Sequence, residues 1–363
     1  MAMRPALVFM STLISKSPPP RVCLLRLSAI GDTCHAAAAL RALQSAWPQT
    51  RFTWIIGKLE AKLMSAILPE IEFITFNKAA TFKELARLRA LLRAREFDLL
   101  LDLQLSVRAS LLSLLVRAPL KVGFDRARAR ELQWLFTNRR IAPAGNQHVL
   151  DSFMGFVRAC GVEPGAPRWD PHLSPQVRES ARALLNDARP TLLISPCSSH
   201  TLRNWSAARY AAVADHAHGL GLRVILVGGP SALELHTGSD IESMARAPLV
   251  NNIGKDSLPQ LLALMAQSTL LLSPDSGPVH MAAMVGLPVI GLYAATRTAR
   301  SGPYLSREWC VDHYEAAAQK YLGKSAAELP WSLKIEKPGV MDLIGIDQVT
   351  AKLDALLAAL KIR

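Results

Sequence analysis

The stretch Leu270-Leu271-Leu272-Ser273-Pro274-Asp275-Ser276-Gly277-Pro278-Val279-His280-Met281-Ala282-Ala283 decides the fold class of this 363-residue chain. Its apolar start predicts a buried strand, and its alanine-rich end predicts a helix. The turn between them is small and polar, so the free N–H groups of the helix start would face a ligand. Asp275 and Ser276 could hold a sugar hydroxyl or a phosphate, and Gly277 lets the backbone approach closely. The alternative is that Asp275 or Ser276 merely caps the helix.

A second strand–turn–helix pattern lies near the other end of the chain. Residues 22–27 predict a buried strand, and a turn of small residues, Ser28-Ala29-Ile30-Gly31-Asp32-Thr33, leads into a helix that runs to about residue 46. An Asp again stands at the junction. Two such turns in two halves of the chain predict two nucleotide-type domains that face each other across a cleft.

The segments between these two turns alternate in the same way. Strands are expected over 22–27, 51–56, 71–76, 98–102, 119–123, 191–195, 223–227, 249–252, 269–273 and 288–293. Helices are expected over 33–46, 58–67, 81–95, 108–116, 148–160, 206–218, 231–246, 257–267 and 278–285. Strands that alternate with helices indicate parallel sheets covered by helices on both faces. The sequence therefore predicts an α/β protein with two Rossmann-like domains.

A stretch rich in proline and glycine over residues 161–175 predicts the linker between these domains. We expect a flexible extension over 1–20, a first Rossmann-like domain over 21–165 and a second over 166–345. The segment 346–363 should form a helix that packs back on the body, because Val349, Leu353, Leu356, Leu357 and Leu360 share one helical face.

Composition narrows the class of protein. Half of the residues are hydrophobic, which allows a sizeable core, yet no apolar run approaches the ~20 residues that span a bilayer. The five cysteines have no metal-ligand or redox spacing, which fits a reducing cytoplasm. The net charge is +13, and residues 81–140 hold 13 Lys and Arg against 6 Asp and Glu. Such a surplus attracts a polyanion. Because no nucleic-acid-binding signature accompanies it and aromatics are only 6%, an anionic membrane or a phosphorylated lipid is the expected partner, not nucleic acid.

The two turns together resemble glycosyltransferase family 9, the lipopolysaccharide heptosyltransferases. The likeness is carried by residues 27–32 (LSAIGD), 275–283 (DSGPVHMAA) and 286–293 (GLPVIGLY), and it runs from about residue 21 to the C-terminus. The resemblance implies the GT-B architecture, in which two Rossmann-like domains flank a cleft. It also implies transfer of a heptose from ADP-heptose to the inner core of lipopolysaccharide, onto Kdo-lipid A or an already heptosylated acceptor.

Within the resemblance, Asp32 corresponds to the family's catalytic base in an inverting transfer, for which one carboxylate suffices. Capping of the following helix is the alternative role of Asp32. The donor would be held by Asp275, Ser276 and Gly277, which match the family's Asp-Thr/Ser-Gly motif, and by a second loop. That loop offers Ser198, Ser199 and Arg203, where Arg203 stands in place of the family's Lys. A surface Arg beside a core Trp is the other interpretation of Arg203.

Three further residues have two open interpretations each. Glu234 could contact the donor nucleoside, or serve as an acid in the first turn of a helix. His280 could point at the phosphates or lie in the core, and His35 could line the cleft or pack. Gly31 belongs to the turn before the first helix, on the acceptor side.

The acceptor side is expected to include the basic residues Arg126, Arg128 and Arg130, which would face the membrane. No Asp-x-Asp triplet and no His/Cys cluster predicts a metal, and no dinucleotide fingerprint predicts a cofactor. We therefore expect a metal-independent enzyme. The resemblance implies that it is peripheral at the cytoplasmic face of the inner membrane, and that its first domain, over 21–165, binds the acceptor and its second, over 166–345, the nucleotide sugar. The alternatives are a sugar-nucleotide transferase or epimerase with another donor, or a non-catalytic basic binding protein.

Overall fold

The computed structural model describes residues 17–77, 79 and 82–362. The first half of the chain forms a six-stranded parallel sheet in the order β3-β2-β1-β4-β5-β6. Its strands are β1 (Arg21–Leu25), β2 (Arg51–Gly57), β3 (Glu72–Phe76), β4 (Leu99–Asp102), β5 (Leu120–Gly123) and β6 (Arg139–Arg140). Its helices are α1 (Ile30–Ala46), α2 (Lys58–Ile67), α3 (Phe82–Arg93), α4 (Val107–Ser113), η1 (Gln133–Leu135) and α5 (Val149–Ala159).

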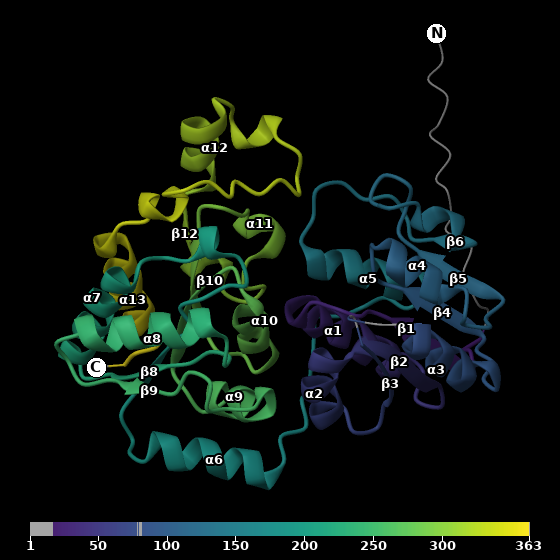
Figure 1. Cartoon of the computed structure of the whole chain (residues 1–363), viewed down its shortest axis with the longest axis horizontal. Helices are drawn as coiled ribbons and strands as arrows, with labels where there is room; N and C mark the ends of the chain where they lie inside the picture. Colours follow the sequence, from purple (N-terminus) through teal and green to yellow (C-terminus); the bar gives the residue numbers. More distant parts are fainter. Residues whose placement is uncertain (1–16, 78, 80–81, 363) are drawn as a thin grey trace.

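The second half forms another six-stranded parallel sheet, in the order β12-β11-β10-β7-β8-β9. Its strands are β7 (Thr191–Ile194), β8 (Arg223–Leu226), β9 (Val250–Asn251), β10 (Leu270–Pro274), β11 (Val289–Tyr293) and β12 (Val311–Asp312). Its helices are α6 (Pro175–Leu185), η2 (Thr201–Arg203), α7 (Ala207–Gly219), α8 (Ala232–Met244), α9 (Leu258–Met265), α10 (Gly277–Met284), α11 (Thr298–Ser301), η3 (Arg307–Trp309), α12 (Tyr314–Leu322), η4 (Ala326–Glu328), η5 (Val340–Leu343) and α13 (Ile346–Ala359). The two halves lie side by side (Figure 1).

Each sheet has one point where the strand order reverses. In the first sheet β1 lies between β2 and β4, and in the second β7 lies between β8 and β10. At such a point the loops that follow the two central strands diverge and leave room for a ligand at the carboxyl edge of the sheet. The loops that follow β1 and β10 are the two turns singled out in the sequence, so the topology places both of them at ligand-binding positions.

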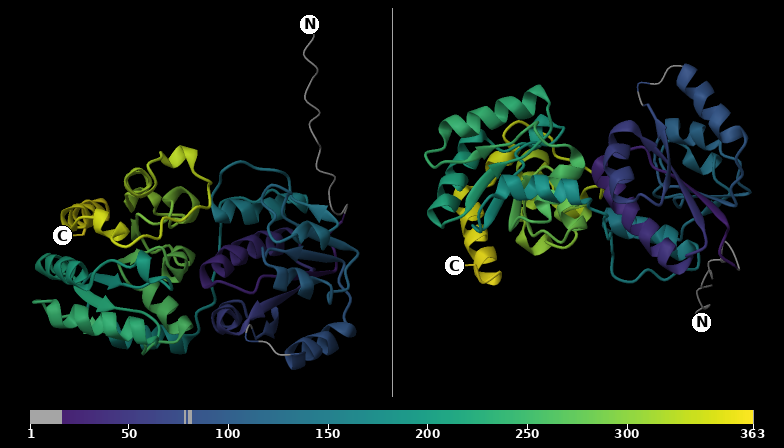
Figure 2. Two further views of the ribbon diagram at one scale, coloured as in Figure 1. Left: turned by 45° about the horizontal axis from the view of Figure 1, so that its top comes forward. Right: turned by 90° about the horizontal axis from the view of Figure 1, so that it is seen from below.

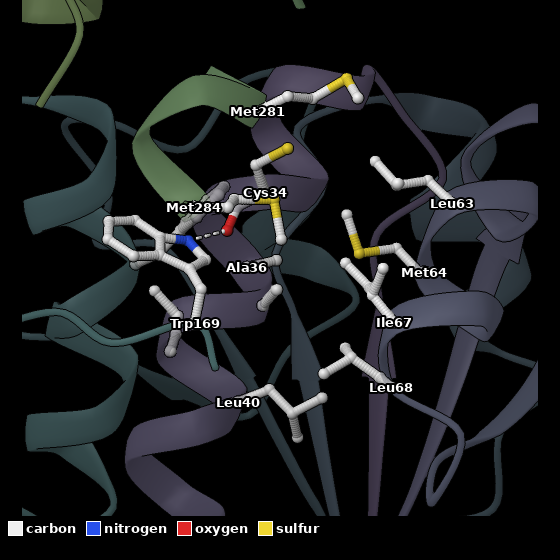
Figure 3. Packing of buried hydrophobic residues seen from close by; sticks show 14 of the residues in the cluster. Cys34, Ala36, Leu40, Leu63, Met64, Ile67, Leu68, Trp169, Met281 and Met284 are labelled. Atoms are coloured by element: carbon white, nitrogen blue, oxygen red, sulfur yellow. Dashed lines mark hydrogen bonds between the residues drawn. The ribbon is translucent and has the colours of Figure 1, made fainter. Parts of the chain in front are cut away.

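The two halves meet through α1 and α10, which pack against each other. Figure 3 shows this boundary: Met281 and Met284 of α10 lie beside Cys34 of α1 in one continuous cluster of buried side chains. From the connecting segment after α5, the buried Trp169 donates its indole N–H to the carbonyl of Cys34 at 2.8 Å. The boundary is therefore packed as a core, and both further views show the halves in contact there (Figure 2).

The expected strands and helices are present close to their sequence-based ranges, but the structure adds elements that were not expected, among them the short edge strands β6 and β12 and the helix α11. Helix α1 begins at Ile30, three residues before the expected start, and α6 follows the connecting segment where no helix was expected. The irregular region after residue 311 contains α12. On α13, which packs on α7, four of the five expected apolar residues are buried, but Leu360 is exposed.

The expected extension over 1–20 lies mostly outside the described residues. Of its described part, Pro19 and Pro20 accept hydrogen bonds from Thr50 and Arg51. Within the described ranges, no helix combines the length and the apolarity that crossing a membrane would require.

Candidate functional site

Asp32 lies in the first turn of α1, at the carboxyl edge of the first sheet. Its carboxylate forms an ion pair with Arg26, which also donates to the carbonyl of Leu103 at 2.6 Å. Arg26 is buried and stacks over Phe153 at 5.4 Å. The guanidinium therefore fixes one oxygen of Asp32, while about a third of the side chain stays exposed.

The structure corrects the alternative that Asp32 is the N-cap of its helix. Ala29 holds the N-cap position, and Asp32 is the third helical residue. Its only link to the cap is a long contact of 3.5 Å from the Ala29 N–H. Because Ala29 has no polar side chain, the first N–H groups of α1 lack a side-chain cap. The start of the helix thus leaves donors available for a ligand.

The helix starts of α1 and α10 approach each other closely across the boundary. A Cβ atom on Gly31 would lie 2.3 Å from Cδ2 of His280, and one on Gly277 would lie 3.5 Å from Cβ of Ile30. Only a residue without a side chain at position 31 permits this approach. The two turns predicted from the sequence therefore meet at one place, with Asp32 on one side and Asp275 on the other.

Asp275 and Ser276 form the turn before α10. Oδ2 of Asp275 accepts a hydrogen bond from the Ser301 hydroxyl at 3.2 Å. Ser276 is the N-cap residue by position, but its hydroxyl pairs with Ser273 at 2.8 Å and does not cap the helix. The start of α10, like that of α1, thus has no side-chain cap.

The loop after β7 contains Ser198, Ser199 and Arg203, which the sequence analysis assigned to the donor. The hydroxyl of Ser198 donates to the carbonyl of His200 at 3.0 Å, so this buried serine shapes the loop, while Ser199 is exposed. Arg203 is only 14% exposed and forms an ion pair with Glu336, with Nε at 2.8 Å from the carboxylate. Burial raises the pKa of Glu336, but the hydrogen bond and charge of Arg203 outweigh it, so the pKa is lowered.

Arg300 lies on the short helix α11, in a segment for which the sequence predicted no helix. Its guanidinium is partly buried and has no hydrogen-bond or ion-pair partner among the described residues. Burial lowers its pKa, and the charges of Asp32 and Asp275 oppose that shift. Arg300 thus lies within electrostatic reach of both carboxylates that the two turns contribute. The only signal in the sequence is that Arg300 follows Arg297 in a short basic segment after β11.

Lys334 is a second cation that was missed. Burial lowers its pKa, and the nearby positive charge of Arg203 adds to the effect, while Glu336 and Asp275 act against it. Arg300 and Lys334 both feel the charge of Asp275, and both also feel that of Arg203, so three cations from separate segments of the second half influence one another. One carboxylate, Glu336, balances part of this charge. Such a concentration of cations beside an uncapped helix start suits a diphosphate.

Glu234 occupies the third position of α8, where both of its carboxylate oxygens are used. Oε1 accepts from the Gly229 N–H at 2.7 Å, and Oε2 accepts from the Ser231 hydroxyl at 2.6 Å. Ser231 in turn caps the helix by accepting from the Glu234 N–H. These contacts are those of a first-turn acid in a reciprocal cap.

Three histidines pack together at the boundary between the halves. The ring of His35 lies 4.5 Å from that of His280 and 5.3 Å from that of His148, centre to centre. His148 accepts from the Leu150 N–H at Nδ1, so its Nε2 carries the proton and donates to the Gly302 carbonyl at 2.9 Å. Burial lowers the pKa of all three rings, that of His148 to about 4. His35 and His280 are thus packed side chains, although His280 still feels the charges of Asp275 and Asp32.

The three arginines expected on the acceptor side have different surroundings. Arg126 is exposed and stacks over Trp134 at 4.9 Å. Arg128 forms an ion pair with Asp125 and is only 18% exposed, so it holds its own loop together. Arg130 reaches across the boundary to the hydroxyl of Ser332.

A basic hollow of about 290 Å³ lies between β6 and α5. Its charged and polar lining consists of Arg128, Arg139, Arg140, Arg158, Gln147 and Asp151. Asp151 is engaged by the Tyr304 hydroxyl of the second half at 2.8 Å. Arg128 and Arg158 are paired with Asp125 and Glu163, but Arg139 and Arg140 form no ion pair among the described residues, so the hollow suits an anionic group. In the described part of the chain, no group of three or more His, Cys, Asp or Glu side chains could hold a metal ion.

Comparison with known proteins agrees with this geometry. Residues 85–332 match the model of glycosyltransferase family 9 (heptosyltransferase). The lipopolysaccharide core heptosyltransferase OpsX of Haemophilus influenzae is 41% identical over 338 residues, which cover 93% of this chain and 97% of that protein.

Solved structures of the family share the fold. A glycosyl transferase family 9 protein from Veillonella parvula superposes with a TM-score of 0.76 at 21% identity, covering 94% of this chain and 97% of that one. The E. coli heptosyltransferase WaaC with ADP superposes with a TM-score of 0.71 at 20% identity, covering 93% and 99%. The predicted GT-B architecture of two facing α/β units is confirmed.

Proposed function

Because this chain belongs to glycosyltransferase family 9, the heptosyltransferases, we propose that it transfers a heptose from ADP-heptose to the inner core of lipopolysaccharide. The family makes the chain a glycosyltransferase, which sets aside the alternative of a non-catalytic binding protein. The similarity to OpsX, a lipopolysaccharide core heptosyltransferase, supports the choice of donor sugar and acceptor class. The observation that carries the proposal is the meeting of the two turns, with Asp32 opposite Asp275.

In this reaction Asp32 acts as the general base. Its carboxylate takes the proton of the attacking acceptor hydroxyl, and the hydroxyl oxygen bonds to the anomeric carbon of the heptose. The bond from that carbon to the β-phosphate oxygen breaks, and its electron pair leaves with ADP. A single displacement of this kind inverts the anomeric configuration and needs one carboxylate. Arg26 supports the role because it orients Asp32 while leaving one oxygen free.

The leaving diphosphate is stabilised by the second half of the chain. We assign it to the uncapped start of α10 and to Arg300, whose guanidinium has no partner of its own among the described residues. Arg203 and Lys334 add charge from the neighbouring loops. Preorganised cations and N–H groups of this kind stabilise the charge that develops on the departing oxygen. The proposal needs no metal, since these groups supply the positive charge.

The acceptor binds to the first half, from which Asp32 projects. The basic hollow lined by Arg128, Arg139, Arg140 and Arg158 supports an acceptor that carries phosphate or carboxylate groups. We propose that the enzyme works at the cytoplasmic face of the inner membrane, where a lipid-linked acceptor is exposed.

The test is transfer by the Asp32→Asn variant. With ADP-heptose and Kdo-lipid A, we expect the wild-type chain to form a product whose new anomeric bond has the inverted configuration by NMR. Loss of a general base should slow transfer by about 10²–10⁴-fold. ADP binding, measured by calorimetry, should be retained, because Asp32 lies on the acceptor side. Near-normal transfer by a folded Asp32→Asn protein would remove this residue from the mechanism. A thermal shift with UDP but not with ADP would instead favour another donor.

A further inference from the structure

The first half of the chain exposes an unusual set of aliphatic side chains close to the catalytic loop. Val107, Leu111 and Leu114 are 47%, 52% and 60% exposed, and Leu132 and Leu135 are 56% and 59% exposed. We call these five residues the leucine face. They fall within a segment of 29 residues, yet they make up five of the sixteen large hydrophobic side chains that are exposed in the described part of the chain. Scattered exposed leucines are ordinary, but a concentration of them marks an interaction surface.

The leucine face is built into the fold. Val107, Leu111 and Leu114 are spaced by four and three residues, so they share the outer side of α4, while Ala109 and Leu112 are buried on its inner side. A solvent-facing side of a helix is ordinarily polar, and here it is aliphatic.

Leu132 and Leu135 are displayed by the segment that adjoins α4. Gln133 between them is buried and donates to the carbonyl of Asp102 at 2.9 Å, so the segment is anchored from within. Leu132 itself has a left-handed backbone, with φ of 60°. Glu131 accepts from the Val107 N–H at 2.6 Å, which ties this segment to the start of α4.

The charge around the leucine face is strongly positive. Residues 106–140 contain eight Lys and Arg but only two acidic residues. Both acids are engaged: Asp125 pairs with Arg128, and Glu131 accepts from the Val107 N–H. Arg117, Arg126 and Arg130 are exposed. Exposed leucines bordered by arginines match the two parts of an anionic bilayer, an apolar interior beneath negatively charged headgroups.

The leucine face also lies beside the proposed site. Gln104, just before α4, accepts from the N–H groups of Leu27 and Ser28 at 3.1 and 3.3 Å, in the loop that leads to Asp32. A surface at this place would bring the base next to an acceptor that stays anchored in the membrane. From this geometry we infer that the leucine face docks the enzyme on an anionic lipid bilayer. The inference deepens the proposed function, because it takes the acceptor to be lipid-linked.

The experiment measures binding of the full chain to vesicles with no donor or acceptor present, so its outcome does not depend on the transfer reaction. The wild type is compared with a Leu111→Gln, Leu114→Gln variant by co-sedimentation with vesicles of phosphatidylglycerol and phosphatidylcholine. The matched control is Leu233→Gln, Leu235→Gln on α8, whose leucines are 38% and 47% exposed in the other half. All four leucines are solvent-exposed, so both variants should fold, and circular dichroism and ADP calorimetry check that they do.

We expect the α4 variant to bind anionic vesicles at least about tenfold more weakly, because it loses apolar side chains that would enter the bilayer. The control variant should bind like the wild type, and vesicles of phosphatidylcholine alone should bind all three proteins weakly. Equal binding by the α4 variant and the wild type would overturn the inference, as would an equal loss in the control. A wild-type dimer in sedimentation that the α4 variant loses would assign the leucine face to a second copy of this chain instead. Failure here with normal transfer to a lipid-free acceptor would leave the proposed function intact.

Discussion

Asp102 gives the most quantitative prediction for the fold that carries the site. This residue ends β4, beside β1, and its side chain is fully buried. One carboxylate oxygen accepts from the Gln104 N–H at 3.2 Å, and the other has no hydrogen-bond partner among the described residues. Burial raises the pKa of Asp102 from its ordinary 3.8 to about 7, although the Gln104 N–H, Gln133 and the charge of Arg26 oppose the rise.

This pKa makes the carboxylate of Asp102 a cost to stability that depends on pH. The folded protein binds the proton more tightly than the unfolded chain does. The contribution of protonated Asp102 to the free energy of unfolding is therefore fully present below pH 3.8 and is lost as the pH rises through about 7. The gap between the two pKa values corresponds to about 4 kcal/mol at pH 8, and to less than about 1 kcal/mol at pH 4.

We expect Asp102→Asn to remove this pH dependence, because the amide keeps an acceptor for the Gln104 N–H but carries no charge. The amide N–H₂ group has no evident partner, which adds a penalty of about 1–3 kcal/mol that does not change with pH. The measured quantity is thus the change with pH: the variant should gain about 3–4 kcal/mol relative to the wild type between pH 4 and pH 8. Denaturant unfolding followed by circular dichroism at each pH would show it.

The control for this experiment is Asp347→Asn, which changes an exposed acid in the first turn of α13. Its effect on the free energy of unfolding should change little over the same pH range. If the difference between Asp102→Asn and the wild type stays constant from pH 4 to pH 8, then Asp102 does not titrate as its burial implies.

Three further changes test the site and its boundary. Arg300→Ala should slow transfer by about 10²–10³-fold and leave the unfolding temperature unchanged. The control, Arg297→Ala, removes hydrogen bonds to two backbone carbonyls and should lower the unfolding temperature. Similar effects of both changes would contradict the role assigned to Arg300. The pKa of His148 is depressed to about 4, so its contribution to stability is present above pH 6.5 and is lost as the pH falls through 4. In the His148→Asn variant, the free energy of unfolding should therefore fall by about 3 kcal/mol less than in the wild type when the pH is lowered from 6.5 to 4. An unchanged fall over this pH range would refute the prediction. Gly31→Ala should cost about 1–3 kcal/mol in the free energy of unfolding, because its Cβ would meet a histidine ring at 2.3 Å, whereas Gly145→Ala meets nothing within 4 Å and should be neutral.

The architecture was largely predictable from the sequence, because it depends on local patterns. Strands buried on both faces are continuous apolar runs, and small polar turns follow them at both reversal points. Helix α6 escaped prediction because it directly follows the stretch rich in proline and glycine, and Pro175, the last residue of the predicted linker, is its first residue. The start of α1 was misplaced for a related reason. Capping preferences favour Asp over Ala at the N-cap, but here Ala29 occupies that position.

The cations of the site were harder to predict, because their roles depend on pairs that are distant in the sequence. Arg203 looked available for a diphosphate, yet its ion-pair partner Glu336 lies 133 residues further along the chain. Arg300 looked like one more basic residue, yet it feels the charges of carboxylates from both halves. Neither fact has a local signature. A donor diphosphate must compete with Glu336 for Arg203, whereas Arg300 has no hydrogen-bond or ion-pair partner among the described residues to give up. The geometry therefore favours Arg300 as the cation that receives the diphosphate first, with Arg203 held in place beside it by Glu336.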